Sequence, residues 1–105
     1  MLTKTLYHGT KHDVDEVMNN PRMGHSANGY GLYLTDNITI ACMYGSVIAF
    51  EVPYDFEVDV MRPMDLGEDI GNHNATELVI NTQATWVKFM KTMEDVYPEP
   101  YATPF

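Results

Sequence analysis

Three short segments of the sequence hold the side chains best suited to chemistry. These segments are residues 6–10 (LYHGT), 29–45 (GYGLYLTDNITIACMYG) and 75–80 (ATELVI). They contain His8, Tyr33 and Glu77, in that order. A neutral imidazole offers one hydrogen-bond donor and one acceptor, an aromatic ring stacks on a flat ligand, and a carboxylate stabilises positive charge. Each of these side chains is also an ordinary strand residue when taken singly, so a functional interpretation depends on their occurring together.

The order and spacing of these segments resemble the ADP-ribosyltransferase superfamily, on its poly(ADP-ribose)-polymerase-like branch. That branch is defined by a His, a Tyr and a Glu on three strands that line one NAD cleft. The family's aromatic-His-Gly-Ser/Thr strand appears at residues 7–10, its Gly-x-Gly-aliphatic-Tyr strand and short helix at 29–44, and its Ser/Thr-Glu strand at 76–80. The resemblance covers most of residues 4–91. It is to the minimal stand-alone form of bacterial and bacteriophage effectors, including anti-CRISPR transferases.

The resemblance implies that the first segment holds NAD, which serves as a co-substrate. His8 would hydrogen-bond the adenosine ribose, and Thr10 would add a hydroxyl contact to ribose. The backbone N–H and C=O of Gly9 would hold the nicotinamide amide, a close approach that the absence of a Cβ permits.

The other two segments would bind and activate the nicotinamide half of NAD. Tyr33 would stack on one face of the nicotinamide ring, and Tyr44 would close the other face. The bond between nicotinamide and ribose would break through an oxocarbenium-like transition state. Glu77 would accept a hydrogen bond from the nicotinamide ribose and stabilise that cation. The family often has a serine three residues before the second tyrosine, where this chain has Ala41, so one polar contact to the amide is missing.

The composition limits the partners and the compartment. The chain has 105 residues, of which 15 are acidic and 6 basic, for a formal net charge of −9. This acidity argues against binding to nucleic acid or to an anionic membrane, and it suits a protein target with a basic surface. Residues 1–10 resemble no signal peptide, and Cys42 has no cysteine with which to pair. We therefore expect a cytoplasmic protein, in the host cytoplasm if it is viral. No HExxH motif or second cysteine supports a metal site.

Short strands and helices must position the three segments. Apolar and alternating patterns predict strands at residues 3–8, 32–34, 47–52, 56–60 and 77–80. Periodicity allows a strand or a helix at residues 85–90, and the resemblance to the family's closing strands favours a strand. A capping box from Thr10 to Asp13 predicts a helix after it, and Asp36 or Asn37 caps a second short helix. Loops are expected at residues 24–31 and 61–74.

These elements predict an α+β fold with a mostly antiparallel sheet. The resemblance makes the fold ADP-ribosyltransferase-like, with split β-sheets around an NAD cleft and short helices. A single domain is expected over residues 1–96, followed by a Pro-rich C-terminal tail at residues 97–105.

The resulting hypothesis is an NAD-dependent mono-ADP-ribosyltransferase that modifies a protein target, such as a host or defence factor, and releases nicotinamide. The short segment between Tyr33 and Glu77 favours single transfer over chain elongation. Two alternatives stay open. One is a non-catalytic module on the same fold that binds NAD, ADP-ribose or a protein, and the other is an acidic nucleic-acid mimic that blocks a basic cleft. The neighbouring RNA 2′-phosphotransferase branch fits poorly, because it binds through arginines and Arg22 and Arg62 lie outside the three segments.

Overall fold

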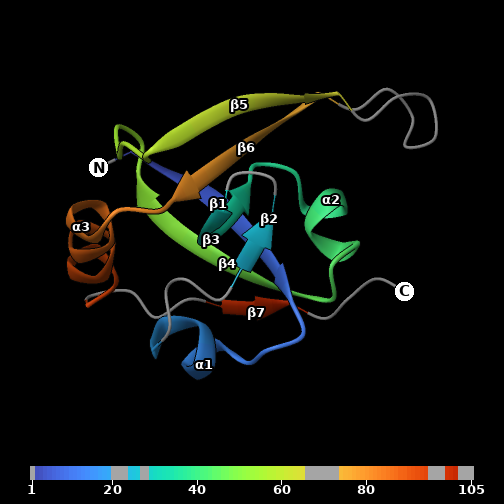
Figure 1. Ribbon diagram of the computed structural model, residues 1–105, viewed down its shortest axis with the longest axis horizontal. Helices are drawn as coiled ribbons and strands as arrows, with labels where there is room; N and C mark the ends of the chain where they lie inside the picture. Colours follow the sequence, from blue (N-terminus) through green and yellow to red (C-terminus); the bar gives the residue numbers. More distant parts are fainter. Residues whose placement is uncertain (1, 20–23, 27–28, 66–73, 95–98, 102–105) are drawn as a thin grey trace.

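The computed structural model describes residues 2–19, 24–26, 29–65, 74–94 and 99–101. Within these residues the chain forms an α+β arrangement of seven strands and three helices (Figure 1). The strands are β1 (Thr3–Thr10), β2 (Gly24–Ser26), β3 (Gly29–Thr35), β4 (Ser46–Pro53), β5 (Val60–Asp65), β6 (Asn74–Ile80) and β7 (Glu99–Tyr101). The helices are α1 (Val14–Asn19), α2 (Ile38–Cys42) and α3 (Gln83–Met93).

The strands form one antiparallel sheet in the order β5-β6-β3-β1-β4-β7, and β2 pairs with β3 outside this path. β1 pairs with β4 along its whole length, from Thr3 to Thr10. Between β1 and β3, whose residues are all described, the register holds one pair, Tyr7 opposite Thr35. The α+β class and the antiparallel pairing agree with the sequence, and β5-β6-β3 and β1-β4-β7 meet at this one pair.

The main core lies on the sheet face that α1 and α3 cover. Because side chains alternate along a strand, Leu6 of β1 and Ile48 of β4 point to this face. They belong to one buried cluster with Val17 of α1 and Phe89 of α3. The ring of Phe89 meets that of Phe50 edge to face, with ring centroids 5.2 Å apart. This cluster fixes the sheet from one side.

The opposite face of the sheet carries α2. Ala41 of this helix packs with Val47 and Tyr7 in a second, smaller cluster. Asn37 begins the helix by accepting a hydrogen bond from a first-turn amide at 2.9 Å, as the sequence predicts. Gly45 follows the helix with a φ of 135°, a left-handed conformation that favours glycine. The helix is thus held between a side-chain cap and a glycine turn.

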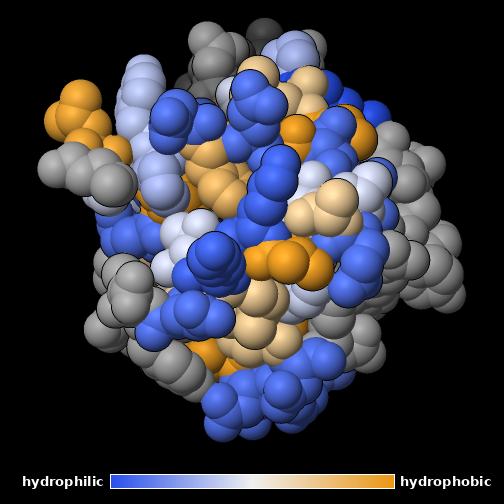
Figure 2. Space-filling view, turned by 90° about the vertical axis from the view of Figure 1, so that its left-hand side faces the viewer, coloured by the Kyte–Doolittle hydropathy of each residue, from blue (hydrophilic) through white to orange (hydrophobic). Residues whose placement is uncertain are grey.

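The expected strand at residues 85–90 is wrong, because this segment lies within α3. Thr82 caps the helix by accepting from the Thr85 amide. Trp86, Phe89 and Met93 follow at helical spacing and are buried against the sheet. Figure 2 faces the side of the molecule where α3 lies, and it shows mostly hydrophilic surface with smaller hydrophobic areas between.

The expected strand at residues 56–60 and loop at residues 61–74 are also corrected. The chain turns after β4, with the amide of Phe56 donating to the carbonyl of Pro53 at 2.9 Å. Asp59 accepts hydrogen bonds from the amides of Asn81 and Thr82 before the strand begins. β5 then runs from Val60 to Asp65, and residues 66–73 lie outside the described residues.

Three further expectations are settled in part by the structure. The loop at 24–31 contains β2 and the start of β3. Asp13, not Thr10, caps α1, because its carboxylate accepts from the Glu16 amide at 2.9 Å. The part of the Pro-rich tail that is described pairs with β4 as β7. In the described ranges, no helix has the length and hydrophobicity that a membrane crossing requires.

Candidate functional site

The sheet face that carries α2 also carries a row of side chains from neighbouring strands. Arg62 of β5 lies opposite Glu77 of β6, Glu77 lies opposite Thr35 of β3, and Thr35 lies opposite Tyr7 of β1. Residues directly opposite each other point to the same face, so these four residues form one cross-strand row. Tyr33 is the diagonal neighbour of Glu77 on that face. In an antiparallel pair the backbones of such neighbours lie about 7–8 Å apart, and their Cβ atoms lie somewhat closer. A ligand on this face can therefore touch both side chains.

The carboxylate of Glu77 is bound by the guanidinium of Arg62. Nε and Nη2 of Arg62 lie 2.9 Å and 2.8 Å from Oε1 of Glu77. The side chain of Glu77 is 16% exposed, whereas that of Arg62 is 46% exposed. Because β5 ends the sheet order, the strand of Arg62 lies on the outer side of Glu77, and the strand of Thr35 lies on its inner side.

His8 comes from β1 but points to the other face of the sheet. It lies opposite Ile48 and is only 9% exposed. Its Nδ1 lies 2.6 Å from the main-chain oxygen of Tyr33. Since a carbonyl can only accept, Nδ1 carries the proton and Nε2 is the acceptor of the ring. Burial lowers the pKa of His8 below 6.5, the hydrogen bond to Tyr33 raises it, and the nearby His12 lowers it further. The imidazole is therefore neutral at pH 7.

Gly9 is packed closely against α2. A Cβ at this position would lie 1.9 Å from the carbonyl oxygen of Ala41 and 3.0 Å from Cβ of Tyr44. A glycine is therefore required here for the helix to lie this close to β1, whatever the protein binds. The same contact places Tyr44 beside Gly9, and the side chain of Tyr44 is 61% exposed at the surface.

Thr10 has a structural role that its sequence motif does not indicate. Its hydroxyl accepts a hydrogen bond from the His12 amide at 3.0 Å, and the residue is buried. This bond shapes the turn between β1 and α1.

The structure brings some of the sequence-predicted residues together and separates others. Tyr33 and Glu77 share the face that α2 covers, and Gly9 and Tyr44 are neighbours on the same side. His8 points to the core face and meets Tyr33 through its main-chain carbonyl. The side chains of His8 and Glu77 therefore point to opposite faces of the sheet.

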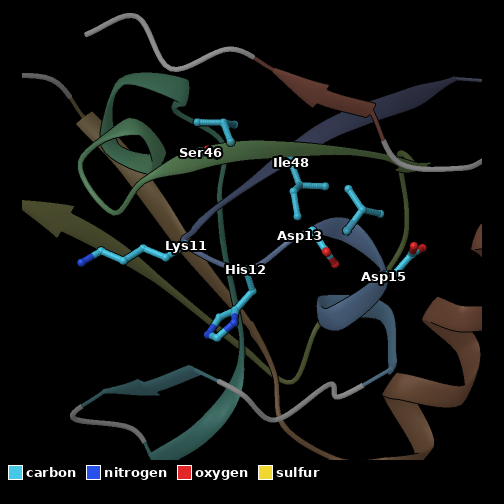
Figure 3. A pocket seen from close by; sticks show the side chains of 8 residues that line it. Lys11, His12, Asp13, Asp15, Ser46 and Ile48 are labelled. Carbon is cyan, nitrogen blue, oxygen red and sulfur yellow. The ribbon is translucent and has the colours of Figure 1, made fainter.

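A shallow groove of about 510 Å³ lies beside the end of β1 and the start of β4 (Figure 3). Its lining residues are Lys11, His12, Asp13, Val14, Asp15, Ser46, Val47 and Ile48. None of the sequence-predicted site residues lines it, although Ile48 lies opposite His8. Within the residues that the structure describes, no cluster of His, Cys, Asp or Glu could hold a metal ion. The groove thus adjoins the His8 side of the sheet and is separate from the cross-strand row.

Arg62 is the site residue that the sequence motifs do not reveal. The proline and glycines of residues 61–74 predict a loop, and a loop residue has no register with Glu77. The alternation of residues 56–60 does not reveal it either, because Met61 and Arg62 both break the order of apolar and polar residues. Its partner strand could not have been deduced from that alternation.

Comparisons with models of protein families, with curated proteins and with solved structures found no match to this chain.

Proposed function

We propose that this protein is an NAD-dependent mono-ADP-ribosyltransferase that modifies a protein and releases nicotinamide. The observation that carries the proposal is the placement of Tyr33 and Glu77 on one sheet face, diagonal to each other and on the side of α2. The hydrogen bond from His8 to the main chain of Tyr33 links the remaining motif to them. An aromatic ring and a carboxylate at this separation suit a flat leaving group attached to a ribose.

In the proposed reaction, the bond between the ribose C1′ and the nicotinamide nitrogen breaks, and its electron pair leaves with nicotinamide. Glu77 supplies negative charge beside the cation that develops on the ribose, and it accepts a hydrogen bond from a ribose hydroxyl. A nucleophilic side chain of the target then bonds to C1′ and loses its proton. Tyr33 holds the leaving ring by stacking.

His8 has a narrower part in this proposal than its motif alone suggests. Its donor is engaged by the Tyr33 carbonyl at 2.6 Å, so its remaining contribution to a ribose hydroxyl is the acceptor Nε2. Burial lowers the pKa of His8, so Nε2 carries no proton at pH 7 and can act as an acceptor. His8 also orients the Tyr33 segment of β3, which connects the two halves of the site.

The experiment compares the unmutated chain with Glu77→Gln and with Glu57→Gln. Glutamine keeps the shape of the side chain and an acceptor for Arg62 but removes the charge. Glu57 is an exposed carboxylate, so its substitution matches the change in net charge. Each protein is incubated with labelled NAD and a cell lysate, and both labelled protein and free nicotinamide are measured. We expect Glu77→Gln to lose both signals while still binding NAD, and Glu57→Gln to keep them. Full transfer by Glu77→Gln would show that the role of Glu77 is wrong.

A non-catalytic module that binds NAD or ADP-ribose is the second candidate. Two observations favour it: Ala41 stands where the family often has a serine, and Glu77 is already engaged by Arg62. This candidate predicts saturable binding of NAD or ADP-ribose by calorimetry, with no nicotinamide released in any lysate. Nicotinamide release that depends on Glu77 would exclude it.

A further inference from the structure

Arg62 contacts Glu77 in a way that restricts the orientation of the carboxylate. Two guanidinium nitrogens, Nε and Nη2, converge on the same oxygen, Oε1, at 2.9 Å and 2.8 Å. Two donors on one oxygen restrict the position of that atom and so limit the side-chain torsions that the carboxylate can adopt. A single ammonium group would supply charge without this geometry, because it is a point charge on a flexible stem.

The strands on both sides of Glu77 hold its backbone in place. Arg62 lies directly opposite on β5, and Thr35 lies directly opposite on β3. The amide of Thr76, the preceding residue, donates to the Asp36 carboxylate at 2.9 Å. With the backbone held in this way, the side-chain torsions of Glu77 are the remaining freedom, and these are what the guanidinium restricts.

We infer that Arg62 is a positioning residue for Glu77. By holding Oε1, it fixes where the carboxylate lies on the sheet face that Tyr33 shares, where the nicotinamide ribose would lie. This inference rests on the proposed transferase function. It adds to the proposed active site a residue that lies outside the three sequence segments. It also gives the ion pair between Arg62 and Glu77 a role in activity, instead of one that blocks Glu77.

The test measures kcat and KM for NAD, by nicotinamide release, in the unmutated chain, Arg62→Ala, Arg62→Lys and Lys88→Ala. Lys88 is an exposed cation on α3, so its substitution matches the loss of charge on the opposite face of the sheet. We expect Arg62→Ala to lower kcat by roughly 10- to 100-fold, the effect of a misoriented catalytic group, with KM changed by less than about twofold. Arg62→Lys should recover part of the loss, and Lys88→Ala should match the unmutated chain.

A second measurement separates positioning from a general loss of structure. In the background of Glu77→Asp, the carboxylate is drawn back by one methylene and the two-nitrogen contact to Oε1 is changed, so adding Arg62→Ala should lower kcat much less than it does alone. Thermal unfolding of all variants verifies that each is folded at the assay temperature.

The outcomes distinguish this inference from the proposal on which it rests. Absence of NAD turnover by the unmutated chain would overturn both. Turnover that Glu77→Gln abolishes, but that Arg62→Ala leaves unchanged or increases, would overturn the positioning role alone. An equal loss from Arg62→Ala in both Glu77 backgrounds would also overturn it, because Arg62 would then act independently of Glu77.

Discussion

The close packing of Gly9 against α2 makes a quantitative prediction about a single methyl group. A Cβ at position 9 would lie 1.9 Å from the Ala41 carbonyl oxygen and 2.8 Å from its carbonyl carbon. These are main-chain atoms, so no flexible side chain can move aside. The helix must retreat by more than about 1 Å to restore ordinary van der Waals separation.

The expected cost of Gly9→Ala follows from this displacement. Overpacking of well-packed sites typically costs about 1–3 kcal/mol, and a clash with backbone belongs at the upper end. We therefore expect a loss of about 3 kcal/mol in the free energy of unfolding. For a domain near 100 residues, this lowers the midpoint of thermal unfolding by about 10–15 °C.

The assay is chemical and thermal unfolding of Gly9→Ala, followed by circular dichroism. Ser46→Ala serves as the control, because Ser46 is exposed on the adjacent strand β4. A loss below about 1 kcal/mol for Gly9→Ala would refute the packing argument. Gly9 would then owe its place to a ligand, as the resemblance implies. A loss near 3 kcal/mol in the free energy of unfolding would show that the packing of α2 requires glycine at position 9 even without a bound ligand.

Three other perturbations test the elements that support the site. Asp59→Ala should lower the free energy of unfolding in urea by about 2–3 kcal/mol, because Asp59 accepts hydrogen bonds from Asn81, Thr82 and Thr85 at the start of α3. The control Asp55→Ala, at an exposed position, should change it little. Burial would raise the pKa of Asp59, but these hydrogen bonds outweigh it and hold the pKa below 3.8, so the stabilisation is present above about pH 3.8 and is lost as the pH falls through the folded-state pKa. The pKa of His8 is lowered from 6.5 in the folded state, so stability should fall as the pH drops below about 6.5, and unfolding measured from pH 8 to pH 5 should show a weaker fall in His8→Gln. Phe89→Ala should cost about 3–5 kcal/mol by calorimetry, because Phe89 is fully buried among aromatic rings.

The strands nearest the core could be predicted from the sequence because their patterns are set by burial. Residues 3–8, 47–52 and 77–80 all fall within observed strands. The segment 85–90 is different. Trp86, Phe89 and Met93 have helical spacing, which is the correct signal, but the resemblance to the family's closing strands favours a strand. The alternation of residues 56–60 is real, but the Phe56 turn and the Asp59 cap use those residues before the strand begins. Local pattern thus identified burial better than it identified backbone conformation.

The site depends on register, which the sequence pattern does not contain. Glu77 was singled out by its motif, but its pairing with Arg62 arises because β5 runs antiparallel to β6 in one particular alignment. A shift of one residue would send Arg62 to the other face of the sheet. The bond from His8 to the Tyr33 carbonyl has the same origin, since it joins strands whose pairing is limited to one described position.

Some of the proposed site residues also contribute to the stability of the fold, and others do not. Glu77 and Arg62 lie on the face opposite the main core, and neither belongs to a buried cluster. Substitution of either should therefore change activity with little change in the free energy of unfolding, since an ion pair at the edge of the sheet with a partly exposed cation contributes about 0–1 kcal/mol. His8 and Gly9 differ from that pair. His8 is buried beside the core, and Gly9 allows α2 to pack closely against β1. Loss of activity in variants of these two residues is interpretable only beside their unfolding curves, so Glu77 and Arg62 are the positions at which the proposed chemistry can be tested on its own.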